Sequence, residues 1–223
     1  MICIRRLGIA IALASSLATL VAAPLPAQAR DHLDRAVTAW AKVKTVRATF
    51  EQSIVNALTG NTLTATGVYQ QQRPGKLAVT FDNPATDRIV ADGKYVWLYL
   101  PSSAPGQVIR SALGSGGTGT VDLTAQFLTA PRKRYTVTAA GTRVVSGRAT
   151  HAYLLVPRAS RDAMFTTATV YIDDRDVTVR QFEVTDKSGL QRKVRLTSFR
   201  TNVPVDASAF VFTPPKGTRV VEQ

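Results

Sequence analysis

Few residues in this sequence are of the types that enzymes use for catalysis. The chain contains two histidines, His32 and His151, and one cysteine, Cys3. Neither histidine has a partner in the sequence at the spacing of a metal site or a catalytic triad. A single cysteine can neither close an internal disulfide nor form a cysteine-based zinc site. The chain also lacks Gly-x-Ser-x-Gly, His-Glu-x-x-His and phosphate-loop motifs. The sequence therefore predicts no catalytic residue, no cofactor and no metal site.

Two short motifs resemble ligand-binding loops but lack the context that such loops need. Gly114–Gly119 matches the Gly-x-Gly-x-x-Gly string of dinucleotide-binding folds. No strand-helix-strand unit is predicted around it, so we interpret it as a surface loop. Asp173-Asp174-Arg175-Asp176 has the carboxylates of a calcium loop without its glycine and its distal glutamate. We expect a charged hairpin turn there.

The first 29 residues have the three parts of a secretory signal peptide. Arg5 and Arg6 precede an apolar run, and Ala27-Gln28-Ala29 is a small-residue cleavage site. Cleavage after Ala29 removes Cys3, so no cysteine remains to carry a lipid anchor. We therefore expect a soluble periplasmic protein whose mature chain, residues 30–223, folds as a single domain.

Positive charge is the strongest feature of the composition. Lys and Arg number 28 against 15 for Asp and Glu, which gives a net charge of +13. The basic residues cluster at 132–134 and at 192–195. These clusters are either solvated faces or a surface for anionic lipid headgroups or an acidic partner. Export and the lack of interleaved aromatic residues argue against a nucleic-acid partner.

The periodicity of apolar residues predicts two helices among many strands. Apolar residues recur at three- and four-residue steps from Asp31 to Val43, which indicates an amphipathic helix with Asp31 as its cap. A second helix is predicted over residues 121–128. Elsewhere the alternation has period two, and Gly-containing turn signals, including Ala140-Gly141, separate the strands. The pattern predicts about ten or eleven antiparallel strands in a curled sheet that helices cap on an apolar concave face.

Several motifs, taken in order, are more specific than any of these patterns. They are Phe50-Glu51-Gln52, Arg73-Pro74-Gly75, Phe81-Asp82-Asn83-Pro84, Ile89-Val90-Ala91-Asp92-Gly93-Lys94, Val96-Trp97-Leu98-Tyr99 and Phe210–Gly217. Together with the signal peptide and the first helix, they resemble the periplasmic outer-membrane lipoprotein carrier family, LolA. The resemblance covers nearly the whole chain.

This resemblance implies a mainly β fold with helices (α+β), a half-open antiparallel β-barrel of about eleven strands covered by a helical lid. It also implies a monomeric carrier without catalysis. The family takes acylated lipoproteins from an inner-membrane ABC-type lipoprotein-releasing complex and passes them to an outer-membrane lipoprotein receptor. That receptor is itself a lipoprotein, and the missing cleavage-site cysteine favours the soluble carrier.

The resemblance also implies roles for individual residues. Arg73 matches the arginine that ties the barrel to the lid helices and releases them on loading. The acyl-chain cavity would be lined by Trp40, Val43, Phe50, Leu77, Val79, Phe81, Leu123 and Phe127, of which Leu123 and Phe127 are assigned to the lid on helical spacing alone. The family often carries aromatic residues where this chain has Leu77 and Val79, so its cavity wall would be aliphatic.

Two other functions are compatible with the sequence. The same fold could carry or sense another lipid or apolar ligand in the periplasm. An esterase with Ser or Asp groups around the cavity is the enzymatic alternative, although no motif supports it.

Overall fold

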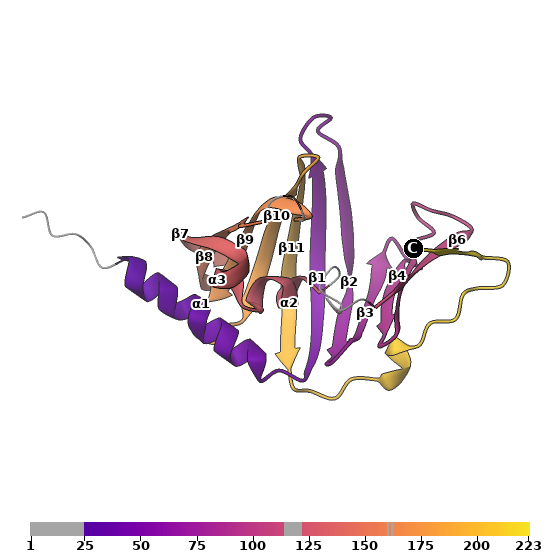
Figure 1. Cartoon of the computed structure of the whole chain (residues 1–223), viewed down its shortest axis with the longest axis horizontal. Helices are drawn as coiled ribbons and strands as arrows, with labels where there is room; N and C mark the ends of the chain where they lie inside the picture. Colours follow the sequence, from indigo (N-terminus) through magenta and orange to yellow (C-terminus); the bar gives the residue numbers. More distant parts are fainter. Residues whose placement is uncertain (1–24, 114–121, 160, 162) are drawn as a thin grey trace, which may run out of the picture.

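The computed structural model describes residues 25–113, 122–159, 161 and 163–223. In that part of the chain, twelve strands form one open sheet in the order β12-β6-β5-β4-β3-β2-β1-β11-β10-β9-β8-β7 (Figure 1). Neighbouring strands are antiparallel, except for the parallel edge pair of β12 and β6. The strands are β1 (Thr45–Asn56), β2 (Thr62–Gln72), β3 (Lys76–Asn83), β4 (Arg88–Asp92), β5 (Tyr95–Tyr99), β6 (Gln107–Ala112), β7 (Tyr135–Val145), β8 (Arg148–Pro157), β9 (Phe165–Asp173), β10 (Val179–Asp186), β11 (Leu190–Thr201) and β12 (Arg219–Glu222).

Three α-helices lie over the half of the sheet that contains β7 to β11 (Figure 1). They are α1 (Leu25–Ala41), α2 (Leu123–Leu128) and α3 (Pro131–Arg134). α1 contacts α2 and the strands β7, β8 and β9. A 3-10 helix, η1 (Ala207–Phe210), lies against β3 and β4, on the segment that connects β11 to β12. The predicted mainly β architecture, a half-open sheet with a helical lid, is confirmed. The sheet has twelve strands where about eleven were expected, and one of them is the short edge strand β12.

α1 is longer at its start than the sequence pattern predicts. The helix begins at Leu25 and continues through Asp31, so the prediction that Asp31 caps it is wrong. Residues 25–30 contain Leu, Ala and Gln, which favour helix, and Pro26 fits the first turn, where its missing N–H has no partner to lose. Cleavage after Ala29 would leave the remainder of this helix on the mature chain.

The Ala140-Gly141 turn signal is wrong as well, because this pair lies inside β7. The pairing of β7 with β8 shifts register between Ala139 and Thr142, as it does at a β-bulge. The chain reverses instead at Ser146-Gly147, a two-residue loop in which both residues have positive φ. That geometry matches the right-handed twist of the flanking strands.

The main apolar core lies between α1, α2 and the sheet. α1 presents Leu33, Ala36 and Trp40, at spacings of three and four residues, and each is at most 4% exposed. A smaller cluster of Val90, Trp97 and Val108 lies at the far half of the sheet, where Phe212 packs against it. Among the described residues, no helix is long and apolar enough to cross a membrane.

Candidate functional site

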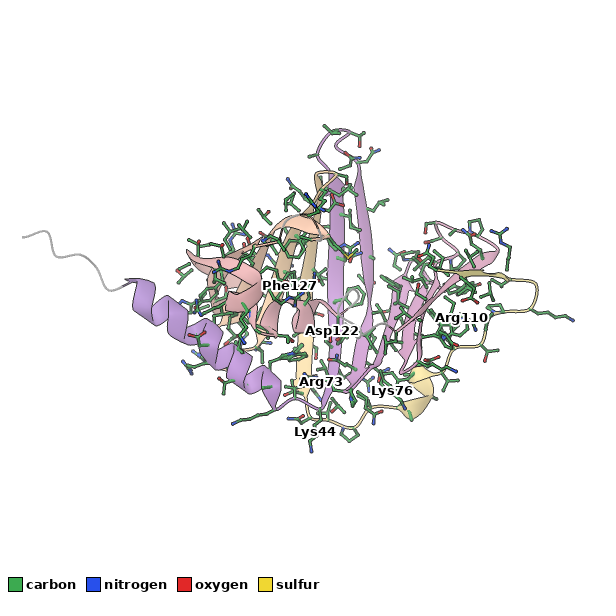
Figure 2. All side chains as sticks on the ribbon, viewed as in Figure 1. Lys44, Arg73, Lys76, Arg110, Asp122 and Phe127 are labelled. Carbon is green, nitrogen blue, oxygen red and sulfur yellow. The ribbon has the colours of Figure 1, made fainter. Side chains whose placement is uncertain are left out.

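Arg73 attaches the C-terminal end of α1 to the turn between β2 and β3. Its Nη1 donates hydrogen bonds to the carbonyl oxygens of Trp40 (2.9 Å) and Val43 (3.1 Å), and its backbone N–H donates to Lys44 (2.8 Å) (Figure 2). The guanidinium carbon also lies 5.1 Å from the centre of the Trp40 ring. Carbonyls at a helix C-terminus lack partners within the helix and carry partial negative charge. Arg73 holds one of them, the Trp40 carbonyl, together with the carbonyl of Val43 two residues past the helix.

The structure gathers the described side chains of the predicted cavity residues into one apolar layer between the lid helices and the sheet. Trp40, Val43, Phe50, Leu77, Val79 and Phe127 are buried in the main core cluster, and Phe81 is partly buried against it. Leu123 is the first residue of α2, and its side chain lies outside the described part of the structure. In this arrangement the lid helices occupy the apolar face that the sequence analysis assigned to acyl chains.

Gly67 on β2 creates the space in which two rings of this layer meet. It pairs with Phe50 on β1 and with Phe81 on β3, so the three residues lie side by side across the sheet. The two rings contact each other edge to face, with centroids 5.6 Å apart. A Cβ on Gly67 would lie 2.3 Å from the Thr80 carbonyl oxygen and 3.0 Å from the Phe50 ring. Any larger residue here would displace the backbone or Phe50.

Phe127 anchors α2 in an aromatic box on the sheet. Its ring lies 5.6 Å from Phe165 on β9, 5.5 Å from Phe182 on β10 and 6.3 Å from Tyr135 on β7. The side chain is fully buried. Aromatic pairs at these separations add specific geometry to a large buried area, so they define where α2 sits.

A buried polar cluster that the sequence analysis missed attaches α2 to β2. Asp122 precedes α2 and caps it, because its Oδ1 accepts a hydrogen bond from the Ala125 N–H (2.9 Å). Its Oδ2 accepts a hydrogen bond from Gln71 Nε2. Both side chains are at most 3% exposed. An Asp at the second position of the helix predicted over residues 121–128 was the available signal, but its partner on β2 could not be read from the sequence.

The electrostatics of this cluster oppose full ionisation. Burial raises the pKa of the Asp122 carboxyl above its usual 3.8, although hydrogen bonds from Ala125 and Gln71 and the charge of Arg73 act in the other direction. Burial also raises the pKa of the Tyr69 hydroxyl well above 10.0, and the charge of Asp122 adds to that effect. Tyr69 and Gln71 alternate on β2, and Arg73 follows directly after the strand at the same two-residue spacing. The end of β2 and the turn after it thus carry polar contacts to α1 and α2.

A hollow of approximately 340 Å³ opens between α1, α2, the turn from β9 to β10, and β11. Trp40 and Val43 line it from the α1 side, Leu128 from α2, Val177 from the turn and Phe199 from β11. Two of the predicted cavity residues therefore lie at an apolar opening at the edge of the lid.

The family model described as outer membrane lipoprotein carrier protein LolA matches residues 41–213. This chain belongs to the LolA family. The matched range contains the lid contacts of Gln71 and Arg73 and every strand from β1 to β11. The resemblance inferred from the motifs is thereby confirmed.

Relatives of this LolA-family chain extend over nearly its whole length. An outer-membrane lipoprotein carrier protein of Bordetella pertussis is 31% identical over 210 residues, which cover 93% of each chain. That of Chromobacterium violaceum is 28% identical over 209 residues, covering 93% of this chain and 94% of the relative. A solved structure of an uncharacterized conserved protein from Thermus thermophilus superimposes with a TM-score of 0.54 at 15% identity. It covers 88% of this chain and 99% of that one, and this likeness shows the fold alone.

The basic clusters of this LolA-family chain are partly engaged in its own contacts. Arg132 on α3 donates from Nε to Asp34 on α1 (2.9 Å), and Arg134 donates to the Gln126 carbonyl at the end of α2 (2.8 Å). The first cluster therefore links the three lid helices. A role of either cluster toward anionic lipids or an acidic partner stays a prediction.

Proposed function

We propose that this protein is a periplasmic carrier that shields the acyl chains of lipoproteins between the inner and the outer membrane. An inner-membrane ABC-type releasing complex would supply the acylated lipoprotein, and an outer-membrane lipoprotein receptor would accept it. The carrier would act as a monomer. Its task requires apolar surface and reversible closure, and no catalytic group.

The Arg73 contact to α1 is the observation that carries this proposal. Exposing acyl chains to water costs about 0.8 kcal/mol per CH₂, so a carrier must enclose them. In the closed arrangement, the lid covers the apolar layer, and Arg73 holds the end of α1 in place. Acyl chains can replace the apolar contacts of the lid, because such contacts are not directional. The two hydrogen bonds of Arg73 are directional and cannot be replaced in that way.

The Asp122 contact supports the same reading for α2. Gln71 at the end of β2 and Arg73 in the turn that follows lie two residues apart and hold different lid helices. A small displacement of that strand end relative to the lid would loosen both helices. These two contacts therefore hold the closed state at one edge of the apolar layer, and α1 is held further along by the ion pair of Asp34 with Arg132.

The direct test is lipoprotein release from inner-membrane spheroplasts, with and without the purified mature protein. We expect acylated lipoprotein in the supernatant as a soluble complex with wild-type protein. Arg73→Leu should fold but load or release its cargo differently. Arg47→Leu, an exposed arginine on the neighbouring strand β1, is the matched control and should behave as the wild type.

The same experiment separates this proposal from a carrier or sensor of another lipid. If no lipoprotein is released while the protein still binds a fluorescent fatty-acid probe, the apolar site is real and the cargo is different. Mass spectrometry of ligand extracted from the protein would then identify it. Unchanged transfer by Arg73→Leu would remove Arg73 from the mechanism.

A further inference from the structure

The two histidines of the chain meet in the folded protein, although they lie far apart in the sequence. His32 Nε2 lies 3.1 Å from Asp174 Oδ1, and His151 Nε2 lies 3.0 Å from the same oxygen. The two imidazole rings stack with centroids 3.8 Å apart. Potential ligand atoms of all three residues lie within 4.8 Å of one another. The sequence analysis found no partner for either histidine, and the tertiary structure supplies one.

Two of the three residues are held by the sheet. His151 lies on β8, paired with Thr142 on β7 and with Ile172 on β9. Asp174 begins the turn from β9 to β10, and its backbone N–H donates to the Ala149 carbonyl (3.0 Å). These backbone contacts fix the positions of His151 and Asp174 relative to each other. His32 comes from α1, so the cluster is complete only while α1 lies on the sheet.

We propose that His32, His151 and Asp174 bind one divalent transition-metal ion of the zinc class between α1 and the sheet. Two imidazoles and a carboxylate, with an open fourth position, form a common ligand set for Zn²⁺. A tetrahedral ion with bonds of about 2.0–2.1 Å holds its ligand atoms about 3.3 Å apart. The distances from Asp174 Oδ1 to the two Nε2 atoms are close to that value. The ion would take the place between the three atoms, and the rings would rotate apart to receive it.

The neighbouring charges leave Asp174 available for this role. Asp173 bonds to Arg148 and Arg180, and Asp176 bonds to the same two arginines. Asp174 instead faces the two histidines. Its carboxylate is half exposed, and the two imidazoles are 14% and 21% exposed, so solvent ions can reach the cluster.

A bound ion would clamp α1 at a second point. Arg73 holds the C-terminal end of this helix, while His32 lies in the part that precedes it by more than two turns. With the metal bound, α1 would be attached to the sheet at both places. The consequence for cargo rests on the proposed carrier function, whereas metal binding itself does not.

The test is calorimetric titration of ZnCl₂ into the exported protein, prepared without a histidine tag. We expect saturable binding of one ion per chain. His151→Ala and Asp174→Asn should each weaken it at least tenfold, since even loss of an outer partner of a metal ligand costs about 10–100-fold. Asp34→Asn is the matched control: it removes a carboxylate from α1 and its bond to Arg132, and should leave zinc affinity unchanged.

A second measurement reports the position of the lid without any cargo. Zn²⁺ should slow hydrogen exchange of the α1 amides in the wild type but not in His151→Ala. Circular dichroism of each variant shows whether it is folded. Absence of saturable binding by the wild type, or equal binding by His151→Ala, would overturn the proposal. If binding is lost in His32→Ala but kept in His151→Ala, the ion is bound near the N-terminus of the exported chain and not by the three-residue cluster. That result would also overturn the proposal.

The two proposals fail in different ways. Zinc binding without any lipoprotein release would leave the metal site in place and remove the carrier function. Lipoprotein release that proceeds normally, together with no zinc binding, would leave the carrier and reduce the His32–His151–Asp174 cluster to hydrogen bonds that hold α1.

Discussion

The guanidinium of Arg73 lies over the indole of Trp40 and donates a hydrogen bond to the carbonyl of that same residue. One side chain thus contacts Trp40 through its ring and through its backbone. The ring contact is a cation–π interaction, and the carbonyl belongs to the last turn of α1. Because both contacts involve Trp40, a movement of α1 away from the sheet would break them together.

Arg73→Lys should distinguish the guanidinium from a simple positive charge. A lysine ammonium is a point charge and cannot place a planar fork over the Trp40 ring while it donates to the Trp40 and Val43 carbonyls. We expect Arg73→Leu to lower the free energy of unfolding by about 2 kcal/mol, and Arg73→Lys to recover less than half of that loss. Urea unfolding measures both values, and hydrogen exchange should show the change concentrated at the end of α1. Full recovery by lysine would contradict the role of the fork.

Asp122 should make the fold less stable as the pH rises. Its pKa is higher in the folded protein than the usual 3.8, because burial disfavours the charged form. An acid of this kind contributes stability below its unfolded pKa and loses that contribution as the pH rises through the folded pKa. Asp122→Asn removes this dependence, and the currently unpartnered Oε1 of Gln71 can accept a hydrogen bond from the new amide when the Gln71 amide turns over.

The measurement for Asp122 is urea unfolding of both proteins from about pH 4 to pH 7. The stability of Asp122→Asn relative to the wild type should increase across that range. Asp206→Asn is the control, since Asp206 caps η1 on the surface and the Ser208 hydrogen bonds lower the pKa of its carboxyl. Its difference from the wild type should change in the opposite direction. A constant difference for Asp122→Asn would show that this carboxyl titrates normally.

Asp173 should have the opposite effect on stability to Asp122. The Arg148 hydrogen bond, further bonds from the Arg175 and Asp176 N–H groups, and Arg180 outweigh burial and lower its pKa. Its stabilising contribution is therefore present above the unfolded pKa of 3.8 and is lost as the pH falls towards the folded pKa. Asp173→Asn should lower the free energy of unfolding at pH 7 by about 2 kcal/mol, less than for a fully buried pair because Arg148 is partly exposed.

The same substitution should reduce the loss of stability in acid. The free energies of unfolding of the wild type and Asp173→Asn should converge as the pH falls below about 4. Asp176 shares both arginine partners with Asp173 but is 43% exposed, so Asp176→Asn should lower the free energy of unfolding much less. Equal losses for the two variants at pH 7 would contradict the importance of burial at Asp173.

Gly67→Ala should destabilise the sheet beneath the lid. The new Cβ would lie 2.3 Å from the Thr80 carbonyl oxygen, a backbone atom that cannot move independently of β3. We expect a loss of about 1–3 kcal/mol, as for other overpacked sites. Thr66→Ala, at the adjacent exposed position on β2, is the control. Chemical denaturation gives both values, and an unchanged midpoint for Gly67→Ala would show that β2 and β3 separate easily.

Local patterns along the chain predict most of the elements of this protein and its family. Apolar spacing in α1, period-two alternation in the strands and the ordered motifs around Arg73 are short-range patterns, and each can be read without knowing where the chain turns. Such patterns reach their limit where local chemistry is ambiguous. Gly141 marks a bulge inside β7 rather than a turn, because glycine suits both, and Asp31 lies within α1 because the residues before it also favour helix.

Which distant residues meet depends on how the elements pack against one another. The pairing of Asp122 with Gln71, and the meeting of His32 and His151 at Asp174, depend on strand register and on where α1 and α2 cross the sheet. Each residue alone looks like an ordinary polar side chain in the sequence. Contacts of this kind arise from packing between elements that are remote along the chain, so no local pattern contains them.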